Sequence, residues 1–222
     1  MVGFADLSPL ASETRQGLPV GVSIAVALDP GIVSRIEDGP TREYEAEYCR
    51  LNALLDELGA LCAQVIREAG YTAITTSAAY GDIDRATLST VLPHKTAATR
   101  AGLGWIGKCA LLVTGDYGSA VRITTVLTDA DLPFGTPVEE SDCGACACCV
   151  ETCPGSAPTG SEWTAGTTRA DFFDAFACFR AAKSLSDEQG IGHIICGMCI
   201  AACPRTQAYL SARGAAGGPS CS

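Results

Sequence analysis

The sequence contains no long apolar run and no recognisable leader segment. Its longest apolar stretch, 20–28, ends at Asp29-Pro30, well short of the roughly 18 residues that a membrane-spanning helix needs. The first 15 residues lack the basic stretch and apolar core of a secretory signal. We therefore expect a cytoplasmic protein with no membrane partner.

Clustered basic residues are absent as well. The chain has 15 Lys and Arg against 25 Asp and Glu, a formal net charge of −10, and no two basic residues are adjacent. Proteins that bind nucleic acids usually neutralise phosphates with clustered Lys and Arg. A nucleic-acid partner is therefore disfavoured.

The first part of the chain, 1–136, has the pattern of an α/β domain. The nearly continuous apolar run 20–28 predicts a buried strand. Residues 44–69 predict a long amphipathic helix that stops at Gly70, and 71–76 predict a second strand. Residues 95–101 predict a short helix, and 111–114 with 120–128 predict a hairpin around 115–118. The predicted buried positions of the long helix are Tyr44, Tyr48, Leu51, Leu55, Leu58, Leu61, Val65 and Ile66.

The pattern changes after a cluster of Pro and Gly near 133–137. Cys, Gly and Pro dominate the predicted second domain, 137–210, in which 171–183 is the one clear helical segment. The Gly-rich end predicts a disordered tail over 211–222.

Cysteine is the exceptional component of this second domain. Nine of the thirteen cysteines lie between Cys143 and Cys203. A disulfide scaffold would need a secretory context, so metal ligation is the better interpretation. The first run has the spacing C-x2-C-x2-C-x3-C before Pro154, as in bacterial ferredoxins with 4Fe–4S clusters, where the fourth Cys binds the other cluster. The second run, before Pro204, is C-x2-C-x3-C and is one ligand short.

Cys178, on the predicted helix 171–183, can supply the missing ligand. Two 4Fe–4S clusters then share eight cysteines in a crossed arrangement, in which each run lends its last Cys to the other cluster. The alternative is a pair of zinc sites of four cysteines each, which typically use two C-x2-C pairs. The first predicted set is Cys143, Cys146, Cys149 and Cys203, and the second is Cys153, Cys178, Cys196 and Cys199.

A second distinctive segment, 101–109, is rich in glycine. It satisfies G-x-G-x-x-G, but a helix-like segment precedes it and a strand-like one follows, which is the reverse of a dinucleotide site. It also satisfies G-x4-G-K, but Cys109 stands where a phosphate loop needs Ser or Thr. Two interpretations remain: a tight turn that packs Trp105 into the core, or a backbone surface that a large cofactor approaches closely.

The order of these motifs resembles the epoxyqueuosine reductase family. The resemblance rests on KTAATRAGLGWIGK at 95–108, on Tyr117-Gly118-Ser119, and on the two Cys-Pro runs. It implies an N-terminal α/β domain of the reductive dehalogenase and epoxyqueuosine reductase type that binds cobalamin, and a C-terminal two-cluster ferredoxin-like domain that passes electrons to cobalt. It places seven residues at the corrinoid wall: Lys95, Gly102, Gly104, Trp105, Gly107, Lys108 and Cys109.

The chain departs from the family at the proton donor. The family's Asp lies 17 residues before the Trp of the motif, where this sequence has Leu88, with Asp82 and Asp84 nearby. His94 stands where the family usually has an acidic residue, and an imidazole is a competent general acid near neutral pH. We therefore predict His94 as the catalytic proton donor, with one ring nitrogen free; the alternative is a histidine at a helix N-terminus, after Pro93, that only forms local hydrogen bonds.

Together these patterns predict an oxidoreductase in a short, divergent branch of that family. Two 4Fe–4S clusters would relay electrons from a donor such as ferredoxin or flavodoxin to a corrinoid, for a reductive reaction on an unknown substrate. Efficient reduction of epoxyqueuosine in tRNA is not expected, because Leu88 cannot deliver a proton and the chain is acidic. The alternatives are an electron-transfer protein or reductive activator of a partner corrinoid protein, and a non-enzymatic cluster-binding module.

Overall fold

The structure, a computed structural model, describes residues 1–78 and 83–215. The chain divides into two compact units, each assembled from separate segments. The first contains 1–26, 50–104 and 122–139, and the second contains 27–49, 105–121 and the chain from 140 onwards. Within the described residues, no helix is both long enough and apolar enough to cross a membrane.

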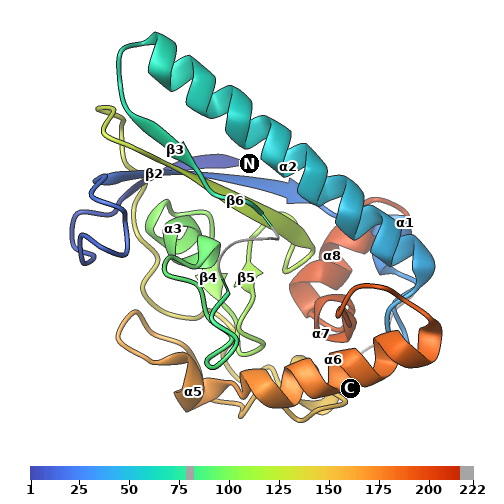
Figure 1. The fold of residues 1–222 in the computed structure, drawn as a ribbon. Helices are drawn as coiled ribbons and strands as arrows, with labels where there is room; N and C mark the ends of the chain where they lie inside the picture. Colours follow the sequence, from blue (N-terminus) through green and yellow to red (C-terminus); the bar gives the residue numbers. More distant parts are fainter. Residues whose placement is uncertain (79–82, 216–222) are drawn as a thin grey trace. The chain divides into compact units, whose positions relative to one another are not determined.

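The first unit is built on a four-stranded sheet in the order β1-β2-β6-β3 (Figure 1). Strand β1 (Val2–Asp6) runs antiparallel to β2 (Val20–Ala27), with Phe4 opposite Val22. Strand β3 (Ala73–Thr75) runs antiparallel to β6 (Val121–Thr128), with Ile74 opposite Leu127. The apolar, β-branched composition of β2 and β6 suits strands buried on both faces.

Helices cover the two faces of this sheet. Helix α2 (Arg42–Glu68) contributes Leu55, Ala63 and Ile66 to a cluster that includes Val126 of β6. The next residue, Leu127, packs on the opposite face with Ala97 of α3 (His94–Arg100). Successive strand residues point to opposite faces, so β6 joins the two halves of the core.

The second unit consists of short helices around a small hairpin. The hairpin pairs β4 (Trp105–Ile106) with β5 (Leu112–Val113). The cysteine-rich part carries α4 (Cys148–Glu151), α5 (Arg169–Phe172), α6 (Ala175–Gln189), α7 (Met198–Ala201) and α8 (Pro204–Ala212). Helix α8 is tied to the segment before α1 (Pro30–Val33), because the Tyr209 hydroxyl donates to the Leu28 carbonyl at 2.9 Å.

Most predicted elements of the first unit are present. The buried strand 20–28 is β2, the short helix 95–101 is α3, and the long helix is α2 with slightly different ends. Strand β1 was not predicted, and β3 is shorter than the predicted 71–76. The stripe along α2 is partly wrong: Leu51 and Leu55 are fully buried, but Leu61 and Val65 are each 57% exposed.

Two predictions about connections are wrong. Strands β5 and β6 do not form a hairpin with each other, because β5 pairs with β4 and β6 joins the large sheet; only an isolated bridge between Thr114 and Gly118 remains. The predicted helix 171–183 is two helices, since the chain becomes extended at Phe173 and Asp174 then caps α6. The predicted tail begins inside α8, and its residues 216–222 lie outside the described residues.

Truncating Leu55 should therefore destabilise the protein strongly. Leu55→Ala removes a fully buried side chain between α2 and the sheet, and we expect a loss of about 2–5 kcal/mol in the free energy of unfolding. Leu61→Ala on the same helix is the matched control, because its side chain is 57% exposed, and its change should stay within about 0.5 kcal/mol. Urea denaturation followed by circular dichroism measures both; equal losses would contradict the packing described.

Candidate functional site

A buried ammonium links the β4–β5 hairpin to the first cysteine run. Lys108 is only 7% exposed, and its Nζ donates to the backbone carbonyls of Gly144 at 2.7 Å and Cys146 at 3.0 Å. The hairpin turns tightly here, because a Cβ on Gly107 would lie 2.8 Å from Val113 Cγ2. A positive charge is thus fixed beside thiols that a metal would need as thiolates.

Several thiols meet around Cys109 of this hairpin. Its sulfur is hydrogen-bonded to those of Cys149 and Cys199, and a Cβ on Gly107 would lie 3.6 Å from both Cys109 Sγ and Cys143 Sγ. The hydrogen bond to Cys109, together with burial, raises the pKa of Cys149. Cys143 and Cys149, two ligands of the first predicted set, therefore both lie near Cys109. Cys199, which the prediction assigns to the second set, lies near Cys109 as well.

A second group of thiols combines three separate segments of the chain. Burial raises the pKa of Cys178 to about 11, and the nearby thiols of Cys153 and Cys196 add to the rise. Burial also raises the pKa of Cys196, with Cys153 again contributing. Cys178 on α6 therefore lies with two cysteines of the predicted second set. Crowded thiols with raised pKa values suit a site in which a bound metal supplies the compensating positive charge.

Local packing holds the end of the first run against α6. A Cβ on Gly155 would lie 2.7 Å from the Ala177 carbonyl oxygen and 2.9 Å from Ala181 Cβ. The backbone N–H of Ala157 donates to Cys153 Sγ at 3.4 Å. Only glycine at 155 allows the chain after Cys153 to approach the helix that carries Cys178 so closely.

The end of the second run is tied to the start of the first. Cys203 is the N-cap of α8, and Pro204 occupies the first helical position, where a missing N–H costs nothing. Two residues after Cys203, Arg205 Nη2 lies 2.9 Å from Asp142 Oδ2. Asp142 directly precedes Cys143. This connection is compatible with the predicted sharing of Cys203 by the first set. Across residues 1–78 and 83–215, no group of three or more His, Cys, Asp or Glu is arranged to hold a single metal ion.

His94 lies in the first unit with both ring nitrogens engaged. Its Nδ1 is 3.0 Å from Thr125 Oγ1, and its Nε2 is 3.0 Å from the Ser77 carbonyl oxygen. Burial lowers its pKa, which favours the neutral ring at neutral pH. The free ring nitrogen that a proton donor needs is not present here. His94 lines a pocket of about 350 Å³ with hydroxyl-bearing residues that include Thr75 and Thr90.

The other residues near the family's proton-donor position are no better placed for that role. Asp84 accepts from the Ala86 N–H and the Thr87 hydroxyl, and the Thr87 bond does most to lower its pKa. Leu88 has a left-handed backbone with φ of 52°. Asp82 lies outside the described residues.

The predicted corrinoid wall is divided between the two units. Lys95, Gly102 and Gly104 belong to the first unit, and Trp105 through Cys109 to the second. Gly102 has φ of +75°, and its Cβ would lie 2.7 Å from the Thr136 carbonyl oxygen, so the protein's own packing requires this glycine. Trp105 is buried, as the tight-turn interpretation predicts, and its Nε1 has no hydrogen-bond partner among the described residues.

Sequence reasoning missed how Lys108 and Cys109 are used. The family resemblance implies a cofactor wall for both, which stays a prediction; the structure adds that Lys108 donates to the loop carrying Cys143 and Cys146 and that Cys109 lies near Cys149 and Cys199. The only available signal was their proximity in sequence to the glycine segment, which gives no distance to residues 143–149.

Sequence comparison connects the chain with epoxyqueuosine reductases. That of Aliivibrio fischeri is 30% identical over 134 residues, which is 57% of this chain and 32% of that protein. That of Listeria monocytogenes is 44% identical over 64 residues, which is 28% of this chain and 16% of that protein. The chain thus spans a third or less of these relatives. No protein-family model matches it.

Solved structures of two enzyme types share the α/β fold. A catabolic reductive dehalogenase in complex with 3-bromo-4-hydroxybenzoic acid has a TM-score of 0.70 at 17% identity, over 93% of this chain and 30% of that one. An epoxyqueuosine reductase with an epoxyqueuosine-modified tRNA stem loop has a TM-score of 0.57 at 21% identity, over 86% and 50%. A reductive dehalogenase described for B12-dependent dehalogenation has a TM-score of 0.70 at 17% identity, over 92% and 29%. The α/β prediction is confirmed; a ferredoxin-like second domain stays a prediction.

Lys108 should be needed to keep the first cysteine run in place. Lys108→Met keeps most of the apolar stem but removes both hydrogen bonds to the Gly144 and Cys146 carbonyls. We expect the free energy of unfolding to fall by about 1.5–3 kcal/mol. Lys183→Met is the matched control, because it breaks only an exposed ion pair with Asp187, worth about 0.3–0.5 kcal/mol. Thermal unfolding together with iron analysis of both variants measures the difference. If Lys183→Met proves as damaging as Lys108→Met, the buried ammonium does not have this role.

Proposed function

We propose that this chain, an epoxyqueuosine reductase-like family member, is an iron–sulfur oxidoreductase that carries two 4Fe–4S clusters and performs a reductive reaction. The observation that carries the proposal is the meeting of Cys178 with Cys153 and Cys196 from three separate segments. A lone cysteine on a helix has no packing reason to lie beside two cysteines of the ferredoxin-type runs. The spacing of the first run, with Pro after its last Cys, is the pattern of 4Fe–4S proteins.

The residues that would hold the two clusters are the eight cysteines of the crossed assignment. When bound, the clusters supply single-electron transfer. The chain's own groups prepare the site: Lys108 places a positive charge beside the first run, and the Ala157 N–H donates to Cys153 Sγ. Cysteines bind iron as thiolates, and donors placed around their sulfurs tune a bound cluster.

A corrinoid is the proposed partner cofactor for the reductive step. The fold similarity to a reductive dehalogenase described for B12-dependent dehalogenation supports it, and so does the buried indole N–H of Trp105, which has no hydrogen-bond partner among the described residues. The corrinoid would supply the cobalt at which a substrate is reduced. Two other predicted wall residues, Gly102 and Gly107, are also required by the protein's own packing.

Electron transfer to a partner corrinoid protein is a second candidate function. The observation that favours it is the state of the described proton-donor candidates. Both ring nitrogens of His94 are bonded, the Asp84 carboxylate is held by local donors, and Leu88 has no proton to give. An electron carrier needs no such donor. The physiological electron source, ferredoxin or flavodoxin, is likewise a proposal.

Cluster content tests the ligand assignment. Anaerobically purified protein should contain about eight iron and eight sulfide per chain. Cys178→Ser should lower this to about four of each, because one cluster loses a ligand. Cys62→Ser is the matched control: Cys62 is a half-buried thiol on α2 with no cysteine among the groups that shift its pKa, and iron content should not change. Full iron content in Cys178→Ser would contradict the assignment, and two zinc ions in place of iron would contradict the cluster type.

Cys203→Ser tests the crossing itself. The variant should damage the cluster held by Cys143, Cys146 and Cys149, and leave the cluster held by its neighbours Cys196 and Cys199. Combining Cys203→Ser with Cys178→Ser distinguishes the crossed from the uncrossed assignment. Under the crossed assignment the double variant loses both clusters. If the double variant retains as much iron as either single variant, Cys203 and Cys178 bind the same cluster and the crossing is wrong.

Corrinoid binding and substrate choice are tested together. Titrating the cluster-loaded protein with hydroxocobalamin should shift the visible corrinoid bands, and Trp105→Phe, which removes only the N–H and part of the ring, should weaken binding about three- to tenfold. Turnover of tRNA carrying epoxyqueuosine should be negligible, because the chain's net charge of −10 opposes a phosphate backbone. An unchanged spectrum favours the electron carrier; rapid turnover on the tRNA would overturn the substrate prediction.

A further inference from the structure

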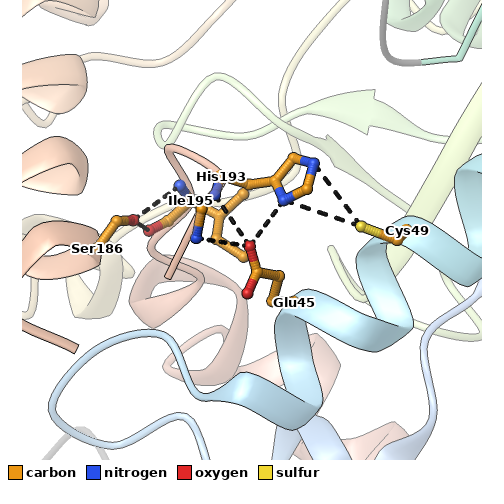
Figure 2. Close-up of polar contacts among 6 residues, drawn as sticks. Glu45, Cys49, Ser186, His193 and Ile195 are labelled. Carbon is orange, nitrogen blue, oxygen red and sulfur yellow. Dashed lines mark hydrogen bonds and ion pairs between the residues drawn. The ribbon is translucent and has the colours of Figure 1, made fainter. Parts of the chain in front are cut away.

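A single carboxylate in the second unit holds the loop that precedes Cys196. Glu45 Oε1, on α2, accepts from the backbone N–H groups of Gly192 at 2.8 Å and His193 at 2.9 Å. The same oxygen lies 2.7 Å from His193 Nδ1. Figure 2 shows these bonds converging on Glu45, with Ile195 held to Ser186 on the other side of the loop. Glu45 therefore fixes the position of the His193 ring.

Cys49 lies one helical turn after Glu45 and beside the same ring. Its sulfur is 3.7 Å from His193 Nε2 and 3.9 Å from Nδ1 (Figure 2). The near-equal distances place the sulfur beside the ring rather than on the axis of one N–H. From this position a ring nitrogen can accept the thiol proton. Cys49 is exposed, so a small molecule can reach it.

The Glu45 carboxylate orients the His193 ring: Nδ1 lies 2.7 Å from Glu45 Oε1, and Nε2 lies 3.7 Å from Cys49 Sγ. Hydrogen bonding by the His193 side chain lowers the pKa of Glu45, so the carboxylate is ionised at neutral pH. The Tyr48 ring lies 5.5 Å from the His193 ring, centroid to centroid, at an angle of 53°. Glu45 and Tyr48 thus face His193 from α2, and His193 faces Cys49 from the loop. A thiol oriented by an imidazole that is itself oriented by a carboxylate is the arrangement of an activated nucleophile.

We propose that Cys49 is a site of reversible S-thiolation by low-molecular-weight disulfides. His193 accepts the proton of its thiol, and Glu45 is a positioning residue that orients the His193 ring. The Cys49 thiolate attacks one sulfur of the disulfide R–S–S–R, the S–S bond of the reagent breaks, and a Cys49–S–S–R bond forms. The proton lost by Cys49 ends on the departing R–SH, so no other oxidant or reductant is needed. The proposal does not depend on a bound cluster or corrinoid.

The position of Cys49 connects this chemistry to the proposed cluster site. An adduct on Cys49 would occupy the space beside His193, which is held only three residues before the proposed ligand Cys196. The adduct would then compete with Glu45 for contact with His193 and so weaken the bonds that hold this loop. A redox change in the surroundings could thereby be transmitted to one end of the second cysteine run.

The chain supplies its own comparison thiol on the same helix. Cys62, also on α2, is half-buried, and burial raises its pKa. Selective modification of Cys49 over Cys62 therefore separates activation by His193 from general thiol reactivity.

The test is glutathione disulfide added to anaerobic, cluster-loaded protein, with the adduct located by peptide mass spectrometry. One adduct is expected, on Cys49, and none on Cys49→Ser. His193→Gln should slow thiolation at neutral pH by about fivefold or more, because it removes the group that accepts the thiol proton. Glu45→Gln keeps an acceptor for the two loop N–H groups but loses the charge, and should also slow the reaction. Cys62→Ser should react as the unmodified sequence does.

The pH dependence distinguishes activation from simple access. At about pH 10 and above ordinary thiols are ionised, so the rates of His193→Gln and Glu45→Gln should converge on that of the unmodified sequence. A deficit that persists at high pH would mean that the loop only blocks access and would overturn the proposal. So would an adduct mainly on another cysteine, or neutral-pH rates that neither substitution changes. Far-ultraviolet circular dichroism of the same samples checks that each variant is folded, whether or not clusters are bound.

Discussion

The second unit depends on the burial of one ammonium group. Lys108 is nearly enclosed, and it satisfies two backbone carbonyls in the loop of the first cysteine run. A buried charge without such partners would be very costly. The hairpin, the loop and the ammonium are therefore mutually dependent: the loop needs the donor, and the donor needs the loop. The tight turn at Gly107 sets the position from which Lys108 reaches across.

Sequence alone could predict the elements whose signals are local. The strand 20–28 and the long helix follow from periodicity and β-branched composition, and the cysteine runs follow from their spacing. The errors arise where partners are distant. Residues 111–114 and 120–128 are close in sequence and read as a hairpin, yet β6 finds its neighbours in β2 and β3. Leu61 and Val65 fit the buried stripe by spacing, yet both side chains are exposed, because spacing does not show which residues of a helix meet a neighbouring element.

The candidate site shows the same division. Cys178 could be named from the count of ligands, and the structure places it near Cys153 and Cys196. Cys49 gave no signal, because the residue that makes it chemically interesting, His193, is 144 positions away. His94 stood out in the sequence as an unusual residue, yet its ring is engaged within the fold by Thr125 and Ser77. Spacing identifies ligands of one run, whereas a group's availability is decided by tertiary neighbours.

The segmented second unit has a consequence for how the chain is made. Its contacts join Leu28 to Tyr209, Glu45 to His193 and Ser119 to Thr206. Each pair links a residue that leaves the ribosome early with one that emerges only near the end of this sequence. The early segments must therefore wait until residues 193–209 have been made before their partners exist, and contacts so distant in sequence form slowly. Until then the segments 27–49 and 105–121 lack the surfaces against which they pack in the second unit.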